Sequence, residues 1–143
     1  MSKFTQPALE DFRAPTKLKL ALLWTSLMFL YIYNDYFILY LPGTITNMMA
    51  GRIGPLGPAT ANVLVGVSML LAIPALMIFL SVALPPLASR WLNLLLGLAY
   101  TAIEALTLHG SVLFYQIIVV FEILITALVV WYSLRWPRSD TPR

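Results

Sequence analysis

The sequence predicts an all-α protein built as a four-helix transmembrane bundle. Of its 143 residues, 60% are hydrophobic and only 10% are charged, and the mean hydropathy is +0.85, which is outside the range of ordinary water-soluble domains. The apolar residues are concentrated in four stretches, 18–41, 59–84, 91–108 and 112–134. Each stretch approaches or exceeds the ~20 residues that an α-helix needs to cross a ~30 Å hydrocarbon core. We therefore expect one integral membrane domain, 1–143, with the lipid bilayer as its main partner.

The first stretch, 18–41, is expected to stay in the mature protein. Its apolar core is longer than the ~7–15 residues of a signal peptide, and no cleavage site of small residues follows it. The connection after it, 42–58, is rich in glycine and proline, which break helices. Apolar residues nevertheless recur within it at roughly helical spacing, at Ile45, Met48, Met49 and Ile53. A short helix on the membrane surface and an ordinary solvated loop both fit this pattern.

The second stretch, 59–84, contains Pro74, which predicts a kinked helix. Proline has no backbone N–H, so Pro74 cannot donate a hydrogen bond to the carbonyl of Leu70. Pro85 and Pro86 follow the stretch and are expected to end the helix.

The third and fourth stretches, 91–108 and 112–134, are separated by only a few residues around His109 and Gly110. A connection this short predicts a tight turn. The two helices that it joins are therefore expected to be antiparallel neighbours.

Basic residues are distributed unevenly between the two sides of the predicted bundle. Eight of the nine lie near the start of the first stretch, between the second and third, or after the fourth: Lys3, Arg13, Lys17, Lys19, Arg90, Arg135, Arg138 and Arg143. Arg52 alone lies on the other side. By the positive-inside rule, both termini are expected in the cytoplasm. No basic run alternates with aromatic residues on a soluble segment, so nucleic-acid binding is not predicted.

Three carboxylic acids, Asp35, Glu104 and Glu122, lie inside the predicted spans. A charged group near the centre of a membrane helix costs about 2.5–3.5 kcal/mol on insertion scales. Each acid therefore needs a compensating partner or a function. With a rise of ~1.5 Å per residue, the three acids would lie ~25, ~20 and ~18 Å from the cytoplasmic boundary, close enough in depth to share one pocket.

In three of the spans the polar and small residues fall on one helix face. These faces comprise Trp24, Met28, Tyr31 and Asp35; Arg90, Asn93, Gly97, Tyr100, Thr101 and Glu104; and Ser111, Tyr115, Glu122, Thr126 and Ser133. Asn34 is expected to point to another side. Gly97, Thr101 and Ala105 also have the spacing at which small residues let membrane helices approach closely. Because unsatisfied polar groups are costly in hydrocarbon, these faces are expected to meet inside the bundle.

The resulting hypothesis is a pocket for a ligand or for protons. Its residues would be Asp35, Glu104 and Glu122, with Tyr100, Tyr115 and Gln116 at a similar level. Carboxyls close together in a low dielectric titrate as a coupled group. Such a group suits proton-coupled permeation or the binding of a cationic or hydroxylated small molecule. The alternative is that each acid is protonated, hydrogen-bonded separately and only holds helices together.

Other chemistry is less well indicated. The chain has no cysteine, one histidine and none of the common nucleophile, zinc-protease or phosphate-loop motifs, so no catalytic residue is predicted and a non-enzymatic protein is favoured. Glu104 and His109 are five residues apart on different faces, so no metal site is predicted, and no cofactor can be identified. Arg90 and Asn93 could form polar contacts between helices or bind a lipid headgroup, or Arg90 could be a positive anchor beside Trp91.

Several short motifs occur in order along 17–137. They are Tyr33-x-Asp35, Ile73-Pro74-Ala75-Leu76-Met77, Ser89-Arg90-Trp91-Leu92-Asn93, Phe121-Glu122-Ile123, Trp131-Tyr132 and Trp136-Pro137. Together they resemble an uncharacterised family of small bacterial four-helix membrane proteins. The resemblance implies a multi-pass protein of the bacterial cytoplasmic (inner) membrane and carries over no activity. Glu104 has no counterpart in that pattern.

The layout of four spans with polar residues in the bundle is more distantly similar to DoxX-like proteins, some of which are subunits of quinol-oxidising complexes. That likeness implies an alternative function, a non-catalytic accessory subunit of a larger membrane complex with a quinone-linked redox role. Since four spans alone enclose little room for a pathway, we expect the protein to form a homo-oligomer or to join such a complex.

Overall fold

The structure, a computed structural model, describes residues 12–108 and 112–138 and is mostly helical, as the sequence predicts. Its four long helices are α1 (Thr16–Ile38), α3 (Ala61–Ala83), α4 (Pro86–Thr107) and α5 (Leu113–Leu134). Between α1 and α3 lie a short helix α2 (Thr44–Met49), strands β1 (Arg52–Ile53) and β2 (Gly57–Pro58), and the 3-10 turn η1 (Gly54–Leu56). The turn predicted around His109 and Gly110 lies outside the described residues.

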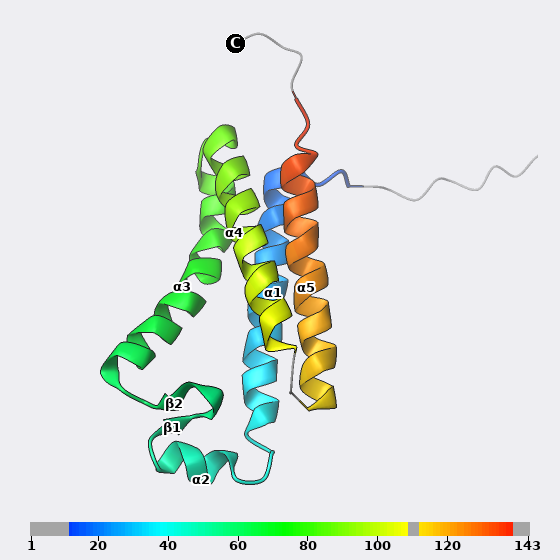
Figure 1. The fold of residues 1–143 in the computed structure, drawn as a ribbon. Coiled ribbons are helices and arrows are strands. Elements are labelled where there is room, and N and C mark those ends of the chain that lie inside the picture. Colours follow the sequence, from blue (N-terminus) through cyan, green and yellow to red (C-terminus); the bar gives the residue numbers. More distant parts are fainter. Residues whose placement is uncertain (1–11, 109–111, 139–143) are drawn as a thin grey trace, which may run out of the picture.

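The long helices are arranged around α1, which contacts α3 and α5, while α4 packs against α5 (Figure 1). The start of α1 and the end of α5 lie at one end of the molecule, and α2 and the strands lie at the opposite end (Figure 1). The N-terminal half of α3 leans away from the other long helices. The shared hydrophobic core therefore draws on the other half of α3, and its residues are Leu20, Trp24, Leu27, Met77, Tyr100 and Val129.

Two helices in the described part of the chain, α3 and α5, are long and apolar enough to cross a membrane. The other two long helices are of similar length, 23 residues in α1 and 22 in α4. They carry more polar residues, among them Lys17, Lys19 and Asp35 in α1 and Arg90 and Glu104 in α4. Where the sequence predicts four spans, length and apolarity thus identify two.

Three prolines determine how α3 is held. Pro74, Pro85 and Pro86 have no N–H to donate to the carbonyls four residues earlier. Side chains of neighbouring helices donate to these carbonyls instead: Tyr100 Oη to Leu70 O at 2.5 Å, Ser89 Oγ to Ser81 O at 2.9 Å, and Lys17 Nζ to Val82 O at 3.0 Å. Helix α3 is therefore attached to α1 and α4 through its own main chain.

Helices α4 and α5 approach closely at Gly97. A Cβ atom at this position would lie 3.0 Å from Val130 Cγ2 and 3.2 Å from Val129 Cγ1, which is tighter than ordinary van der Waals contact. One turn further along α4, Thr101 Oγ1 lies 2.9 Å from Thr126 Oγ1 of α5. The close approach predicted from Gly97 and Thr101 is therefore confirmed, whereas Ala105 is exposed.

The connection between α1 and α3 is more ordered than a plain loop. Helix α2 confirms the helical alternative for part of 42–58, and it follows Gly43, whose φ of 84° is left-handed and favours glycine. The strands pair antiparallel, with Arg52 opposite Pro58 and Ile53 opposite Gly57. This small hairpin was not predicted from the sequence, because two-residue strands produce no alternating pattern.

Candidate functional site

Two groups of buried polar side chains lie between the long helices. The carboxyl cluster consists of Tyr31 and Asn34 of α1, Thr101 and Glu104 of α4, and Glu122 and Thr126 of α5. The asparagine cluster consists of Trp24 of α1, Ser81 of α3, and Ser89 and Asn93 of α4. The two clusters differ in how completely their hydrogen-bonding atoms are paired.

Glu104 is paired at both carboxyl oxygens. It is only 3% exposed, and its Oε1 accepts a hydrogen bond from Tyr31 Oη at 2.6 Å. Its Oε2 lies 3.0 Å from Thr126 Oγ1, which donates to it. The Glu104 side chain thereby joins α4 to α1 and to α5 at one level.

The Thr126 hydroxyl has more neighbouring acceptors than it can serve at once. Besides Glu104 Oε2, the main-chain oxygen of Glu122 lies 3.0 Å from Thr126 Oγ1. The Thr126 oxygen in turn accepts from Thr101 Oγ1 at 2.9 Å. A hydroxyl donates a single proton, so Thr126 can bind Glu104 or the α5 main chain, and a change in one bond changes the other.

Glu122 and Asn34 are incompletely paired. Glu122 is 3% exposed and Asn34 is 5% exposed, and their side chains are close enough to interact. Even so, Glu122 Oε1 and Asn34 Oδ1 are buried without a hydrogen-bond partner. Buried polar atoms in folded proteins are nearly always hydrogen-bonded. Two unpaired acceptors on interacting side chains therefore mark a place that requires a donor.

Asp35 lies on the exposed side of α1, and Asn34 takes the interior position. This corrects the expectation that Asp35 faces the pocket and Asn34 points elsewhere. Neighbouring residues are about 100° apart on a helix, so Asn34 and Asp35 exchange places when α1 is rotated by about that angle. The signal that was missed is the spacing of three and four residues that runs from Leu20 through Trp24 and Leu27 to Asn34.

The remaining predicted pocket residues have other partners or positions. Tyr100 stands one turn before Glu104 on α4, but its hydroxyl donates to the carbonyl of Leu70. Gln116 Nε2 donates to the carbonyl of Leu108 at 3.3 Å. Tyr115 is half-buried near the start of α5. The structure thus brings together Glu104 and Glu122 from the predicted set and adds Asn34 and Tyr31.

Asn93 uses its hydrogen-bonding atoms fully. Its Oδ1 accepts from Trp24 Nε1 at 2.7 Å and from Ser81 Oγ at 3.1 Å, and its Nδ2 donates to Ser89 O at 2.8 Å. Asn93 and its three partners are all 0% exposed. The asparagine cluster therefore joins α1, α3 and α4 and leaves no atom of Asn93 for a ligand.

Arg90 also makes a contact between helices. Its Nε donates to the carbonyl of Ser133 at 3.0 Å, and its guanidinium lies 5.7 Å from the centre of the Trp91 ring. The contact with Ser133 links the start of α4 to the end of α5. It places Arg90 at the end of the molecule that holds the start of α1.

The charges of the described residues are separated along the long helices. Lys17 and Lys19 lie in the first turn of α1, Arg90 lies near the start of α4, and Arg135 follows α5, all at the same end. The carboxyl cluster lies beyond the hydrophobic core, toward the end that carries α2. An acidic interior and a basic end therefore occupy different levels of the molecule.

Comparisons with known proteins identify a family for this chain and supply no activity. A family model described as "Family of unknown function (DUF6326)" matches residues 9–142, nearly the whole chain. No curated protein and no solved structure matches the chain.

Proposed function

The chain belongs to the DUF6326 family of unknown function, and we propose that it is a multi-span protein of the bacterial cytoplasmic membrane whose carboxyl cluster is a site for a small molecule or for protons. In this proposal α1, α3, α4 and α5 form a four-helix bundle across the bilayer, with both chain ends in the cytoplasm. The cluster then serves small-molecule binding or proton-coupled permeation.

The exposed surface supports the membrane placement. Large apolar side chains are exposed along all four long helices, among them Phe29, Ile32, Leu64, Val65, Phe79, Leu95, Leu98, Leu106, Ile117 and Leu124. Water-soluble proteins rarely expose apolar patches that extend over a whole surface. In lipid the same side chains are in their preferred solvent, and the buried polar residues are where the bundle interior requires them.

The charge separation supports the orientation. The basic residues at the ends of α1, α4 and α5 would lie at the cytoplasmic surface under the positive-inside rule. Trp91 and Trp131 belong to the same end, and the Arg135 guanidinium lies 4.2 Å from the centre of the Trp131 ring. Tryptophan and arginine side by side are typical of a membrane interface.

The observation that carries the proposal is the unpaired state of Glu122 Oε1 and Asn34 Oδ1. A polar group that only holds helices together uses its atoms on protein partners, as Glu104 and Asn93 do. Glu122 and Asn34 do so only in part, since one oxygen of each stays without a partner. An acid with a free oxygen inside a membrane bundle is costly to keep, and binding a ligand or a proton accounts for that cost.

The decisive test is the Glu122→Gln variant in liposomes. The purified protein would be reconstituted into liposomes that contain a pH-sensitive dye, and proton entry would be followed after a potassium diffusion potential is imposed. Glutamine keeps the size of the side chain but cannot take up or release a proton. We expect the protein-dependent proton flux to fall by about tenfold or more, as is typical when a proton-transfer group is lost.

The matched control is Asp35→Asn, which makes the same chemical change on the exposed side of the same level. Its flux should stay close to that of the unaltered protein. Circular dichroism and thermal melting in detergent would establish that both variants are folded. An unaltered flux in folded Glu122→Gln would reject the proton role.

A second candidate function, an accessory subunit of a larger membrane complex, is favoured by the N-terminal half of α3. This segment leans away from the other helices (Figure 1), and Leu64, Val65 and Met69 on it are exposed. A neighbouring subunit would cover these side chains. Co-purification of large foreign subunits from native membranes in mild detergent would support this role, whereas a homogeneous homo-oligomer or monomer would contradict it.

A further inference from the structure

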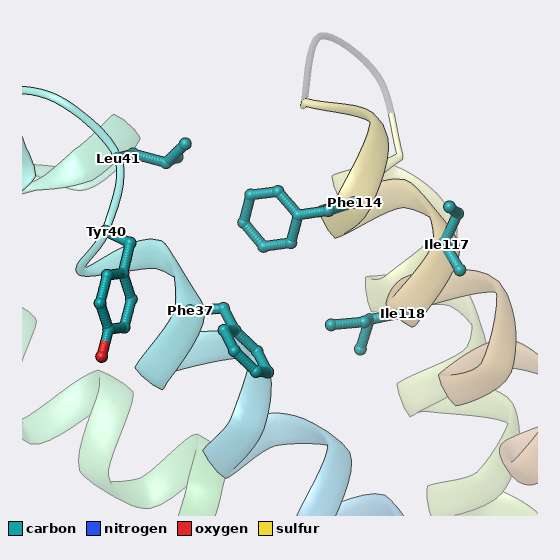
Figure 2. A pocket seen from close by; sticks show the side chains of 6 residues that line it. All are labelled: Phe37, Tyr40, Leu41, Phe114, Ile117 and Ile118. Atoms are coloured by element: carbon teal, nitrogen blue, oxygen red, sulfur yellow. The ribbon is translucent and has the colours of Figure 1, made fainter.

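A hollow of about 490 Å³, open to the surface, lies between the end of α1 and the start of α5 (Figure 2). It is lined by Phe37, Tyr40, Leu41, Phe114, Ile117 and Ile118. The Tyr40 hydroxyl is shared with the Tyr36 hydroxyl at 2.8 Å, so the hollow presents mainly hydrocarbon and aromatic surface. Its volume is within the ~300–1,000 Å³ of small-molecule sites in proteins.

Asn34 and Glu122 do not line this hollow, but their spacing from two residues that do puts them about one helical turn deeper. Phe37 and Ile118 point toward one another from α1 and α5 (Figure 2). Asn34 precedes Phe37 by three residues and Glu122 follows Ile118 by four, and residues at these spacings share a helix face. The hollow and the two unpaired acceptors therefore lie in sequence along the seam between α1 and α5.

The two unpaired atoms specify the polar part of an occupant. When Glu122 is ionised, its Oε1 and the Oδ1 of Asn34 are both acceptors, so the missing partner is a hydrogen-bond donor. The neighbouring acid Glu104, and more weakly Asp35 on the exposed side of α1, favour a positive charge on that donor. Lys17, Lys19 and Arg90 lie at the other end of the molecule. A protonated amine meets both requirements.

The hollow specifies the apolar part. An acyl chain from the bilayer would fill the hollow but would leave the two acceptors unpaired. A water molecule would satisfy the acceptors and leave the hollow unfilled. A lipophilic amine does both, and the faces of Phe37 and Phe114 additionally favour a cation that passes them.

We infer that the hollow together with Asn34 and Glu122 is a binding site for a protonated lipophilic amine. Its apolar body lies among Phe37, Phe114 and Ile118, and its ammonium group donates to Glu122 Oε1 and Asn34 Oδ1. This inference rests on the proposed function, and it names the class of small molecule that the carboxyl cluster takes.

The test uses 4-phenylbutylamine as the probe and butylbenzene as its matched apolar body without an ammonium group. Binding to the protein in lipid nanodiscs would be measured by equilibrium dialysis against empty nanodiscs, so that partition into lipid is subtracted. We expect saturable binding of the amine that is at least about tenfold tighter than that of butylbenzene, because a hydrogen bond to a charged group is worth about 1.5–3 kcal/mol.

Three variants locate the site. Glu122→Gln should weaken amine binding by about tenfold or more and leave butylbenzene binding unchanged. Ile118→Trp, which fills the hollow, should weaken both ligands. Asp35→Asn is the control and should change amine binding by less than about threefold, since exposed charges contribute little. Melting in detergent would confirm that the variants are folded, and Glu122→Gln decides the question if Ile118→Trp does not fold.

Equal affinity for amine and butylbenzene would overturn the inference in favour of an acyl chain. Absence of saturable binding, or amine binding unaltered in folded Glu122→Gln, would overturn it as well. These outcomes are separable from those of the liposome experiment. Proton flux that depends on Glu122, without saturable amine binding, rejects the amine site alone, whereas amine binding without such flux rejects permeation alone.

Discussion

The asparagine cluster and the carboxyl cluster are both polar, both buried and both shared among several helices, yet their hydrogen-bonding atoms are paired to different degrees. Asn93 accepts from Trp24 and Ser81 and donates to Ser89. Glu122 keeps one oxygen unpaired and lies beside Asn34, which does the same. The difference teaches that burial of a polar residue does not by itself indicate a site. The indicator is an atom that the protein leaves without a partner.

The largest change in stability is expected from Asn93→Leu in the asparagine cluster. Leucine has nearly the same size but removes two hydrogen bonds between helices, from Trp24 of α1 and Ser81 of α3, and one within α4, to Ser89. The two bonds between helices are worth roughly 0.6 kcal/mol each, and the Trp24 N–H is left buried without an acceptor, so the free energy of unfolding should fall by about 2 kcal/mol. Unfolding in mixed micelles would measure it.

Asn93→Asp, measured at a pH low enough to keep the new carboxyl protonated, serves as the control for that variant, since its oxygens can still accept from Trp24 and Ser81 while an ionised carboxyl there would be costly. It should lose less stability than Asn93→Leu. Equal stability of Asn93→Leu and the unaltered protein would show that the asparagine cluster does not hold the helices together. The structural role that distinguishes it from the carboxyl cluster would then be wrong.

In the carboxyl cluster the expected change in the free energy of unfolding has the opposite sign. Glu122→Leu removes an incompletely paired acid, and replacing buried charged groups by apolar ones of similar volume is often stabilising. We expect the free energy of unfolding to rise by about 1 kcal/mol while Glu122-dependent proton flux or amine binding is lost. A loss of stability as large as that of Asn93→Leu would mean that Glu122 is a structural residue after all.

A smaller effect is expected from Thr126→Val, which keeps the shape of the side chain and removes its hydroxyl. Glu104 Oε2 then loses its donor, so the free energy of unfolding should fall by about 0.6 kcal/mol. The same micelle assay would measure it, with Ser133→Ala as a control, because the Ser133 hydroxyl bonds only within α5. A drop well above 1 kcal/mol would indicate that the Thr126 hydroxyl supports more than Glu104 alone.

The smallest effect is expected from Asp35→Asn. Asp35 is on the exposed side of α1, one turn before its end at Ile38, where the carboxyl can reach the membrane surface. Its replacement should therefore change the free energy of unfolding by no more than about 0.5 kcal/mol. Proton flux and amine binding should also stay nearly unchanged. If Asp35→Asn instead matched Glu122→Gln in either assay, the exposed acid would belong to the site and the interior assignment of Asn34 would be wrong.

Helices and buried faces were predictable from the sequence to different degrees. The apolar stretches 18–41 and 112–134 lie within a few residues of α1 and α5, because long runs of apolar residues have few alternatives to a helix. The third stretch, predicted to begin at residue 91, begins at Pro86 in the structure. Proline is favoured at the first position of a helix, where its missing N–H is not needed, so Pro86 marks a helix start that apolarity alone places at residue 91.

The candidate site was harder to predict because it depends on helix rotation. The faces of α4 and α5 are marked by several polar residues each, so Glu104 and Glu122 could be assigned to the interior from spacing alone. On α1 the polar residues Asn34 and Asp35 are adjacent, and either one continues a spacing of three and four residues. Packing of Trp24 against Tyr100, whose ring centres are 5.8 Å apart, fixes the rotation in the structure.

The hydrogen bonds to main-chain carbonyls of α3 could also be predicted only in part. The absence of a donor at Pro74 could be predicted to leave the carbonyl of Leu70 free, because it follows from covalent chemistry. The identity of the donor, Tyr100, could not be predicted, because nothing in the sequence around Pro74 indicates which helix packs against α3 at that level. Tyr100 was accordingly expected in the pocket.

Pro74, Pro85 and Pro86 have a consequence for how α3 can move. A helix whose main-chain bonds are all internal can slide or turn against its neighbours without breaking any of them. Helix α3 cannot, because the carbonyls of Leu70, Ser81 and Val82 are each bound to a side chain on another helix. Its height and rotation are thus set by residues outside it, and a displacement of α1 or α4 must carry α3 along or break these bonds.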